Sequence, residues 1–217
     1  GVNEDRLVAI RNGVDLANFY PIDGQARAQL RSRLGLPDRL TAVFVGQLAR
    51  RKGLLELLEA WPGVRKDCPE AQLLVVGSGS LEPEVRCGAA RPESGISYLG
   101  ERRDVSDLFR CADIAVLPSR NESFGCSFVE ALASGTPLIA GRTGVAATLP
   151  IDGNAGFVID AITPAVIQKK LAALFADAER RARFAEAGPA LVAQFGFEHV
   201  SGEYLRLYES IVALESQ

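Results

Sequence analysis

Two glutamates are separated by seven intervening residues in the stretch Glu122-Ser-Phe-Gly-Cys-Ser-Phe-Val-Glu130. A polar loop precedes Gly125 and an apolar helical pattern follows it, so Glu122 is expected in a loop and Glu130 about one turn into a helix. Such carboxylates can accept hydrogen bonds from the hydroxyls of a hexose and from the vicinal diol of a ribose, while helix N–H groups between them hold phosphate. The spacing alone is weak evidence, because Glu93 and Glu101 share it.

Lys52 stands directly before a second expected helix, which begins at Gly53. A cation and unpaired helix N–H groups would then face the same space, which suits a diphosphate. The loop is not a Walker A motif, because six residues separate Gly46 from Gly53 and the lysine precedes the second glycine. Gly77-Ser-Gly79 is not a dinucleotide fingerprint either, because Glu82 occupies the position of the third glycine.

Short β-branched runs alternate with longer helical patterns along the chain, which is typical of a parallel sheet with helices on both faces. The predicted fold class is α/β: a doubly wound, Rossmann-like parallel sheet of about six strands that ends in a helical segment. Strands are expected at 41–45, 72–76, 96–99, 113–117, 137–140 and 156–159, and helices at 53–61, 81–89, 105–111 and 124–134, with a short turn around Val145.

The two ends of the chain depart from this alternation. Residues 1–20 are expected to form an entry segment or linker with a strand at Leu7-Val-Ala-Ile10, and residues 21–195 to form the sheet domain. From Thr163 onward the chain is expected to be helical, with interruptions at Gly188-Pro189 and Phe195-Gly196. Residues 196–217 are expected to form a C-terminal helix that is amphipathic over 200–214.

Five loops leave the carboxyl ends of the expected strands, and ligands of open parallel sheets bind at that edge. Both compact basic clusters, Arg50–Lys52 and Arg102–Arg103, fall on these loops. Their convergence on one edge predicts an anion site there. The loops are 46–53, 77–80, 100–104, 118–125 and 141–144.

Composition excludes several function classes. The chain has 217 residues, a net charge of −3 and an isoelectric point near 5.4, which argues against a nucleic-acid partner. The four cysteines form no C-x-x-C motif and His199 is the only histidine, so no metal is predicted and the thiols are expected to be free and at least partly buried. No apolar run approaches the ~20 residues of a membrane span, and no apolar signal peptide precedes the charged first residues, so a cytoplasmic location is expected.

The chain also contains no Met. The missing initiator indicates a domain excised from a longer chain, whereas excision leaves the lack of internal Met unexplained.

An ordered set of motifs gives this chain a family resemblance. The motifs are Asn12-Gly-Val-Asp15, Val45-Gly46 with Lys52-Gly53, Val75-Val-Gly-Ser-Gly79, Tyr98-Leu-Gly100, Ala112-Asp113 with Pro118-Ser119, and above all the run from Glu122 to Ala140. In this order they resemble the C-terminal, donor-binding domain of retaining nucleotide-sugar glycosyltransferases with the GT-B fold, the glycosyltransferase group 1 family. The resemblance extends from about Leu7 to the C-terminus.

The resemblance implies a role for each matching residue. Lys52 matches the lysine that neutralises the donor diphosphate and Glu122 the acid near the donor hexose, and these two are the expected catalytic residues. Phe124 and Gly125 match backbone that meets sugar and phosphate, and Glu130 matches the acid that binds the ribose diol. The full expected donor-binding set is Gly46, Gln47, Arg51, Lys52, Gly79, Arg103, Glu122, Ser123, Phe124, Gly125, Cys126 and Glu130.

The resemblance also implies a reaction. A hexosyl group would pass from a UDP-, GDP- or ADP-sugar to an acceptor hydroxyl with retention of configuration, with no cofactor and no protein base on this domain. The acceptor, a saccharide or a lipid, would bind an N-terminal domain toward which the C-terminal helix packs, and the whole enzyme could associate peripherally with a membrane. This fragment alone would be inactive.

Two positions depart from the family pattern. Gln47 stands where the family has Arg, a charge that Arg51 could supply, and Thr143-Gly-Val-Ala-Ala147 replaces a Gly-Gly-x-Pro-Glu stretch. Two alternatives remain open: another GT-B-like enzyme, such as a nucleotide-sugar epimerase or a phosphorylase, and a non-catalytic nucleotide-sugar-binding domain.

Overall fold

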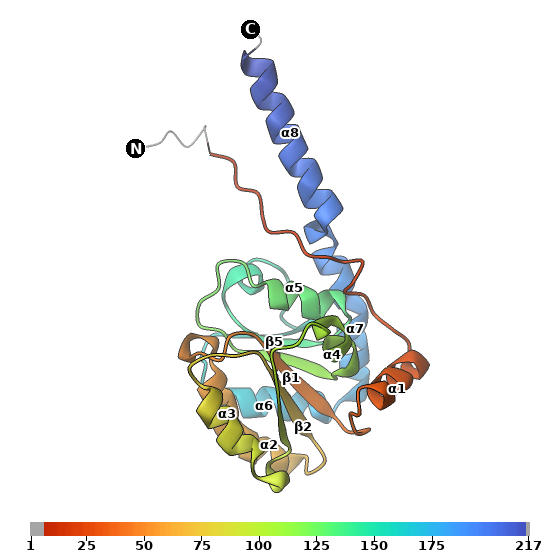
Figure 1. The fold of residues 1–217 in the computed structure, drawn as a ribbon, viewed down its shortest axis with the longest axis vertical. Coiled ribbons are helices and arrows are strands. Elements are labelled where there is room, and N and C mark those ends of the chain that lie inside the picture. Colours follow the sequence, from red (N-terminus) through yellow and green to blue (C-terminus); the bar gives the residue numbers. More distant parts are fainter. Residues whose placement is uncertain (1–6, 216–217) are drawn as a thin grey trace.

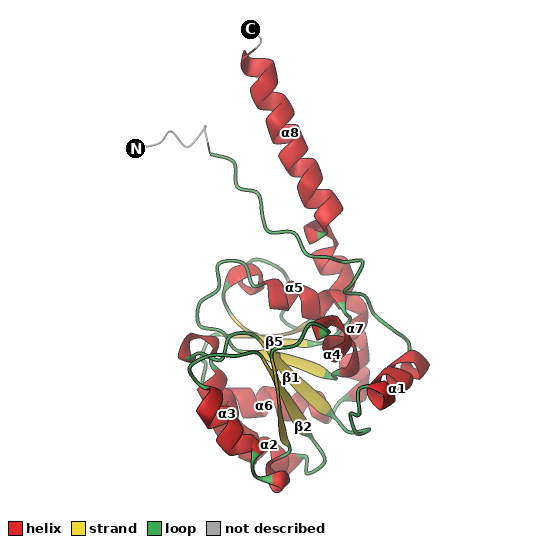
Figure 2. Ribbon diagram, in the orientation of Figure 1, coloured by secondary structure: helices red, strands yellow, loops and turns green. Residues whose placement is uncertain are grey.

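A computed structural model describes residues 7–215 of the chain. Six parallel strands form one sheet in the order β3-β2-β1-β4-β5-β6 (Figure 2). The strand order reverses between β1 and β4, which makes the sheet doubly wound, as the sequence predicts. The strands are β1 (Thr41–Val45), β2 (Gln72–Val76), β3 (Ile96–Gly100), β4 (Ile114–Leu117), β5 (Leu138–Gly141) and β6 (Gly156–Ile159).

Helices cover both faces of this sheet (Figure 1). Helix α2 packs against α6 on one side, and α5 packs against α7 and α4 on the other. The strands between these layers are buried almost completely, with Val43, Leu74 and Ile139 fully inaccessible, except for the edge strand β3, which is half-buried. The helices are α1 (Gly24–Arg33), α2 (Leu54–Asp67), α3 (Glu82–Ala89), α4 (Val105–Cys111), α5 (Cys126–Ala133), α6 (Pro164–Phe175), α7 (Ala178–Val192) and α8 (Phe197–Glu215).

Two expected helix boundaries are wrong for the same physical reason. Helix α2 continues through Pro62 and Gly63, and α7 continues through Gly188-Pro189. At each place the glycine lies against another helix: a Cβ at Gly63 would be 2.3 Å from Gln168 of α6, and one at Gly188 would be 2.7 Å from Leu132 O of α5. Close helix packing therefore outweighs the local breaking tendency of the Pro-Gly pairs.

Other expectations also need correction. No regular structure forms at residues 7–10, where a strand was expected, because Leu7 and Val8 are exposed and the described chain offers them no strand to pair with. The thiol of Cys87 is exposed on α3, whereas Cys111 is buried and Cys68 and Cys126 are half-buried. The first six residues of the predicted entry segment lie outside the described residues.

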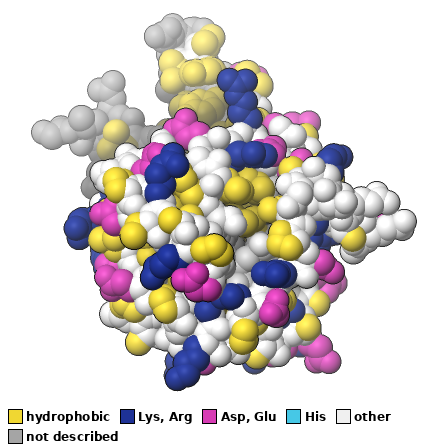
Figure 3. All heavy atoms as spheres, turned by 60° about the horizontal axis from the view of Figure 1, so that its bottom comes forward, with side chains coloured by type: hydrophobic (Ala, Val, Ile, Leu, Met, Phe, Trp, Pro, Cys, Tyr) yellow, Lys and Arg dark blue, Asp and Glu magenta, His cyan; other side chains and the backbone are white. Residues whose placement is uncertain are grey.

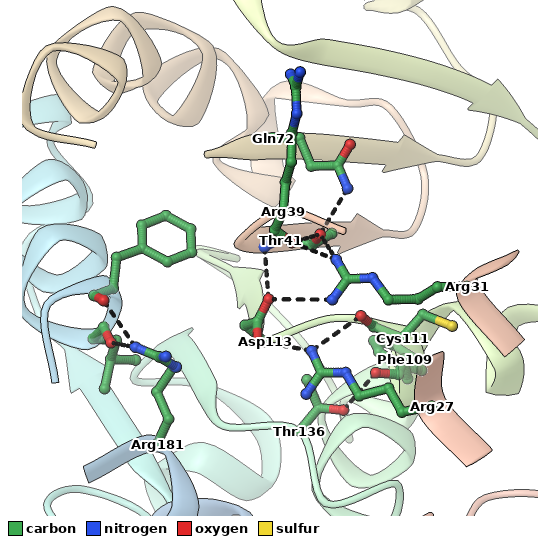
Figure 4. Close-up of polar contacts among 12 residues, drawn as sticks. Arg27, Arg31, Arg39, Thr41, Gln72, Phe109, Cys111, Asp113, Thr136 and Arg181 are labelled. Carbon is green, nitrogen blue, oxygen red and sulfur yellow. Dashed lines mark hydrogen bonds and ion pairs between the residues drawn. The ribbon is translucent and has the colours of Figure 1, made fainter. Parts of the chain in front are cut away.

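Helix α1, which the sequence patterns miss, is held by charge at the amino ends of the strands (Figure 4). Arg27 Nη2 donates to Asp113 Oδ1 at 2.7 Å, and Arg31 forms an ion pair with the same carboxylate at 3.8 Å. Asp113 Oδ2 in turn accepts from Thr41 N at 2.7 Å, and Gln72 Nε2 donates to Thr41 Oγ1 at 2.7 Å. Burial lowers the pKa of Arg31, partly offset by the charge of Asp113. This network therefore fixes the sheet edge opposite the predicted ligand edge.

The entry segment and α8 meet at one point and then leave the sheet domain together (Figure 1). Val14 N donates to Phe195 O at 2.7 Å, and Phe197 N donates to Val14 O at 3.2 Å. Beyond this junction α8 exposes Tyr204, Leu205 and Tyr208. Among residues 7–215, no helix combines the length and the apolar character needed to cross a bilayer.

Charges of both signs are interspersed on the face that Figure 3 turns forward, where Lys and Arg side chains alternate with Asp and Glu. That face shows no continuous basic surface of the kind that tracks a nucleic-acid backbone.

Candidate functional site

A cavity of about 600 Å³ opens where the strand order reverses. Its walls come from the loop after β1, from the loop after β4 with the first turn of α5, and from the entry segment. Seven of the residues predicted from sequence lie together there: Arg51, Lys52, Glu122, Ser123, Phe124, Gly125 and Cys126. The remaining lining residues are Asn12, Asn121 and Ser127.

Lys52 and Glu122 form an ion pair between Nζ and Oε1 in this cavity. Their side chains are only 16% and 14% exposed. Charges so far removed from water attract each other more strongly than a surface pair does, and each would be costly to leave alone. Arg51 adds a second cation to the lining. The three charged side chains of the lining, Arg51, Lys52 and Glu122, therefore give the cavity a net positive charge.

A tight turn places Lys52. Residues Arg50–Lys52 form a single 3₁₀ turn that ends at Gly53, whose φ is +68°. A Cβ at Gly53 would lie 2.1 Å from Pro118 O, so only glycine lets this turn approach the loop after β4.

Arg120 joins the lysine turn to the glutamate loop. Its backbone N–H donates to Arg51 O at 2.8 Å, and its guanidinium contacts both carboxylate oxygens of Glu56 on α2, at 3.1 and 2.8 Å. Burial alone would raise the pKa of Glu56, but the hydrogen bonds and charge of Arg120 bring it below its ordinary value. The Glu56 interaction raises the pKa of Arg120.

Helix α5 points its N-terminus at the cavity. It begins at Cys126, two residues later than expected, because Gly125 takes a left-handed conformation at the N-cap. No side chain among residues 7–215 caps this end by a hydrogen bond. The first N–H groups of α5 and the positive end of its dipole are thus open to an anion.

Five predicted residues lie outside the cavity lining: Gly46, Gln47, Gly79, Arg103 and Glu130. Gln47 still contacts the site, because its Oε1 accepts a hydrogen bond from Arg51 Nη2 at 2.8 Å. A Cβ at Gly79 would lie 2.5 Å from Leu48 O, so the loops after β1 and β2 pack backbone to backbone. Arg103 is exposed at the end of the loop after β3.

Glu130 lies one turn into α5 and is half-buried. Burial raises the pKa of its carboxyl. A carboxylate that is poorly solvated there gains more than an exposed one from hydroxyl donors brought by a ligand.

Asn12 is a lining residue that the sequence reasoning did not select. Its Nδ2 lies 3.9 Å from Cys126 Sγ and donates a weak hydrogen bond to it. Asn12 begins one of the motifs that carry the family resemblance, so the sequence did mark this position. Nothing local indicates, however, that the entry segment folds back to a helix 114 residues later.

His199 lies outside this cavity. It is on α8, 3.6 Å from Glu203 and half-exposed. Among residues 7–215, no three His, Cys, Asp or Glu side chains group where they could hold a metal ion.

The model of the family "Glycosyl transferases group 1" matches residues 26–191. A D-inositol 3-phosphate glycosyltransferase of Xylanimonas cellulosilytica is 35% identical over an alignment of 224 residues that covers 96% of this chain and 52% of that protein. The chain thus spans about half the length of the curated relatives it matches.

Solved structures give the same fold. The C-terminal domain of a glycosyl transferase group 1 family protein of Francisella tularensis is 26% identical, with a TM-score of 0.74 over 84% of this chain and 97% of that one. HepE of Anabaena, solved in complex with UDP, is 23% identical, with a TM-score of 0.81 over 93% of this chain and 57% of that one. The expected fold, the carboxyl-terminal half of a GT-B architecture, is confirmed.

Proposed function

The chain belongs to the group 1 glycosyltransferases, and on that premise we propose that its cavity binds the nucleoside-diphosphate sugar from which a hexosyl group is transferred. One observation carries the proposal: Lys52 and Glu122 meet beside the uncapped N-terminus of α5. The lysine and the helix end suit the diphosphate, and the glutamate suits the sugar beside it.

The diphosphate lies, in this proposal, between Lys52 and the first turn of α5. Bond cleavage leaves growing negative charge on the β-phosphate, and a cation and N–H groups already in place stabilise it without reorganising. Arg51 lines the cavity and holds Gln47, which supports the view that it supplies the charge that Gln47 lacks.

The two glutamates bind the two sugars. Glu122 accepts a hydrogen bond from a hydroxyl of the hexose, and Glu130 accepts from the ribose diol one helical turn away. The half-buried position of Glu130 supports this role, because two hydroxyl donors would offset the cost of its desolvated charge.

The transfer retains configuration. The bond between the sugar and the β-phosphate breaks through an oxocarbenium-like transition state, and the acceptor oxygen bonds to the sugar. An oxygen of the departing phosphate takes the proton of the acceptor hydroxyl. This scheme calls for no cofactor, no metal and no protein base on this domain, and it gives His199 no part in the chemistry.

The acceptor site lies in the part of the protein that this chain does not include. We propose that the exposed apolar residues Tyr204, Leu205 and Tyr208 of α8 pack against that part. The names of the curated relatives add a phosphorylated cyclitol to the saccharide and lipid acceptors worth testing. A cytoplasmic location, with peripheral membrane association of the whole enzyme, completes the proposal.

The experiment is a thermal-shift and calorimetric panel of UDP, GDP and ADP with their sugar conjugates on the full-length protein. A ligand that binds only the folded state raises the melting temperature, and the matching sugar nucleotide should do so at micromolar to millimolar concentrations. Failure of every member of the panel to bind would contradict the proposal. Binding of a sugar nucleotide with no transfer to any acceptor would leave a binding domain instead of an enzyme.

A further inference from the structure

We propose that Thr143 is a positioning residue that fixes Glu122 opposite Lys52, an inference that rests on the proposed function of the cavity. The hydroxyl of Thr143 contacts both backbone groups of Glu122. Oγ1 accepts from Glu122 N at 2.8 Å and donates to Glu122 O at 3.2 Å. One side chain thereby holds the main chain of the residue whose carboxylate pairs with the lysine.

The segment that carries Thr143 is itself held firmly. Thr143 N donates to Gly141 O at 2.8 Å, at the end of β5, and Ala146 N donates to Thr143 O at 3.1 Å. The threonine is therefore tied to the sheet on one side and to the 3₁₀ turn Gly144–Ala147 on the other.

The next two residues continue the contact with the glutamate loop. Val145 N donates to Phe124 O at 2.8 Å. A Cβ at Gly144 would lie 2.3 Å from Phe124 O and 3.2 Å from the Cβ of Glu122, so the two segments touch main chain to main chain. Residues 143–145 thus form a wall that packs along residues 122–124.

This arrangement matters because the backbone link between the lysine turn and the glutamate loop ends at Arg120, two residues before Glu122. The lysine turn is set by Gly53 and Arg120, whereas Glu122 lies in a loop between β4 and α5. Without the hydroxyl, the N–H and C=O of Glu122 lose a partner, and the carboxylate can move relative to the donor sugar. Small displacements of a positioned group cost large factors in rate.

The wall occupies the stretch in which this chain departs from the pattern that it otherwise resembles. Thr143 is not among the residues that line the cavity. Its role is seen only in the hydrogen bonds that it makes.

The test uses Thr143→Val, which keeps the shape and removes the hydroxyl, and Thr143→Ser, which keeps the hydroxyl. The probes are UDP with UDP-glucose, GDP with GDP-mannose and ADP with ADP-glucose, and the pair that the full-length wild type binds is used throughout. We expect Thr143→Val to weaken binding of the sugar nucleotide about tenfold and to lower kcat for transfer by a similar factor. Affinity for the free nucleotide should change less than about twofold, because Lys52 and α5 are untouched.

Comparison with three other variants separates positioning from general stability. Thr143→Ser should recover most of the sugar-nucleotide affinity. Thr148→Val is the matched control, since Thr148 Oγ1 donates to Val145 O at 3.3 Å in the same segment without touching Glu122. In a Glu122→Gln background, Thr143→Val should have no further effect on sugar-nucleotide affinity, because the carboxylate through which it acts is gone.

The outcomes divide cleanly. Equal losses of nucleotide and sugar-nucleotide affinity in Thr143→Val, or an undiminished affinity for both, would overturn the role of Thr143 alone. A full additional loss in the Glu122→Gln background would also overturn it. If the wild type binds none of the probes, the proposed function fails and this role with it.

Discussion

Lys52 and Glu122 come from loops that leave neighbouring strands, β1 and β4, and their charged groups neutralise each other inside the cavity. Glu122 is therefore the counter-ion of Lys52 in this structure. In the proposed function, an incoming diphosphate would compete with Glu122 for the lysine, and the carboxylate would become free to meet the sugar as the phosphate binds.

Removing the carboxylate charge should separate binding from transfer. In Glu122→Gln the lysine is no longer paired, so the affinity for the free nucleoside diphosphate should rise a few-fold. Transfer should fall about a hundredfold, since the hexose loses its charged acceptor. Calorimetry and single-turnover kinetics measure the two effects. A fall in nucleotide affinity would show that Glu122 supports diphosphate binding instead of competing with it.

Removing the lysine should weaken diphosphate binding directly. Lys52→Ala loses a charge-assisted hydrogen bond worth about 1.5–3 kcal/mol, or about ten- to a hundredfold in affinity. It also leaves Glu122 buried beside the phosphates. Lys66→Ala, at an exposed position near the end of α2, is the control and should bind as the wild type does. Equal binding by both variants would place the diphosphate elsewhere.

Glu130 makes the free energy of unfolding depend on pH. Burial raises its pKa above that of the unfolded chain, so between the two values the folded protein binds more protons. The free energy of unfolding therefore decreases as pH rises through this window. Glu130→Gln should remove that slope and raise the melting temperature at neutral pH, while it weakens nucleotide binding about tenfold.

Melting curves and calorimetry from pH 4 to pH 8 test whether Glu130→Gln raises stability while it weakens nucleotide binding. Glu59→Gln, at an exposed position on α2, should leave the slope unchanged. Lower stability of Glu130→Gln at neutral pH would mean that the charge of Glu130 stabilises the unliganded fold.

The Arg120–Glu56 pair should contribute more to site geometry than to stability. Because 43% of the Arg120 side chain is exposed, a double-mutant cycle with Arg120→Met and Glu56→Gln should give a coupling of only about 0.5–1 kcal/mol. Arg120→Lys cannot contact both carboxylate oxygens in the same plane, so it should lose donor affinity with little change in melting temperature. A coupling near zero together with full donor affinity in Arg120→Lys would rule out a bracing role.

The strands could be predicted almost residue by residue because each contains a short apolar run, and all but the half-buried edge strand β3 are almost completely buried. Helix α1 could not, since Leu30 is its one buried apolar residue and its attachment is an ion pair with Asp113, which lies directly before β4 and far away in the sequence. Apolar periodicity carries no trace of such a contact. The continuation of α7 through Pro189 could not be predicted either, because it depends on a contact between Gly188 and a residue of another helix.

Some residues of the candidate site could likewise be predicted from the sequence, and others could not. Residues on the loops after β1 and β4 could be grouped from topology alone, because parallel strands deliver their following loops to one edge. Asn12 and Thr143 could not, since the first comes from an entry segment with no regular structure and the second acts on the backbone of another loop. Side-chain contacts with main chain leave no spacing pattern in a sequence.

The pairing of Val14 with Gly196 gives the two ends of the domain a shared pivot. The entry segment and α8 are joined by backbone hydrogen bonds on both sides of Val14 before they diverge. A displacement of either segment at this junction would therefore be passed directly to the other through these two hydrogen bonds. Asn12, which lines the cavity, is only two residues from Val14, so the same junction links α8 to the cavity wall.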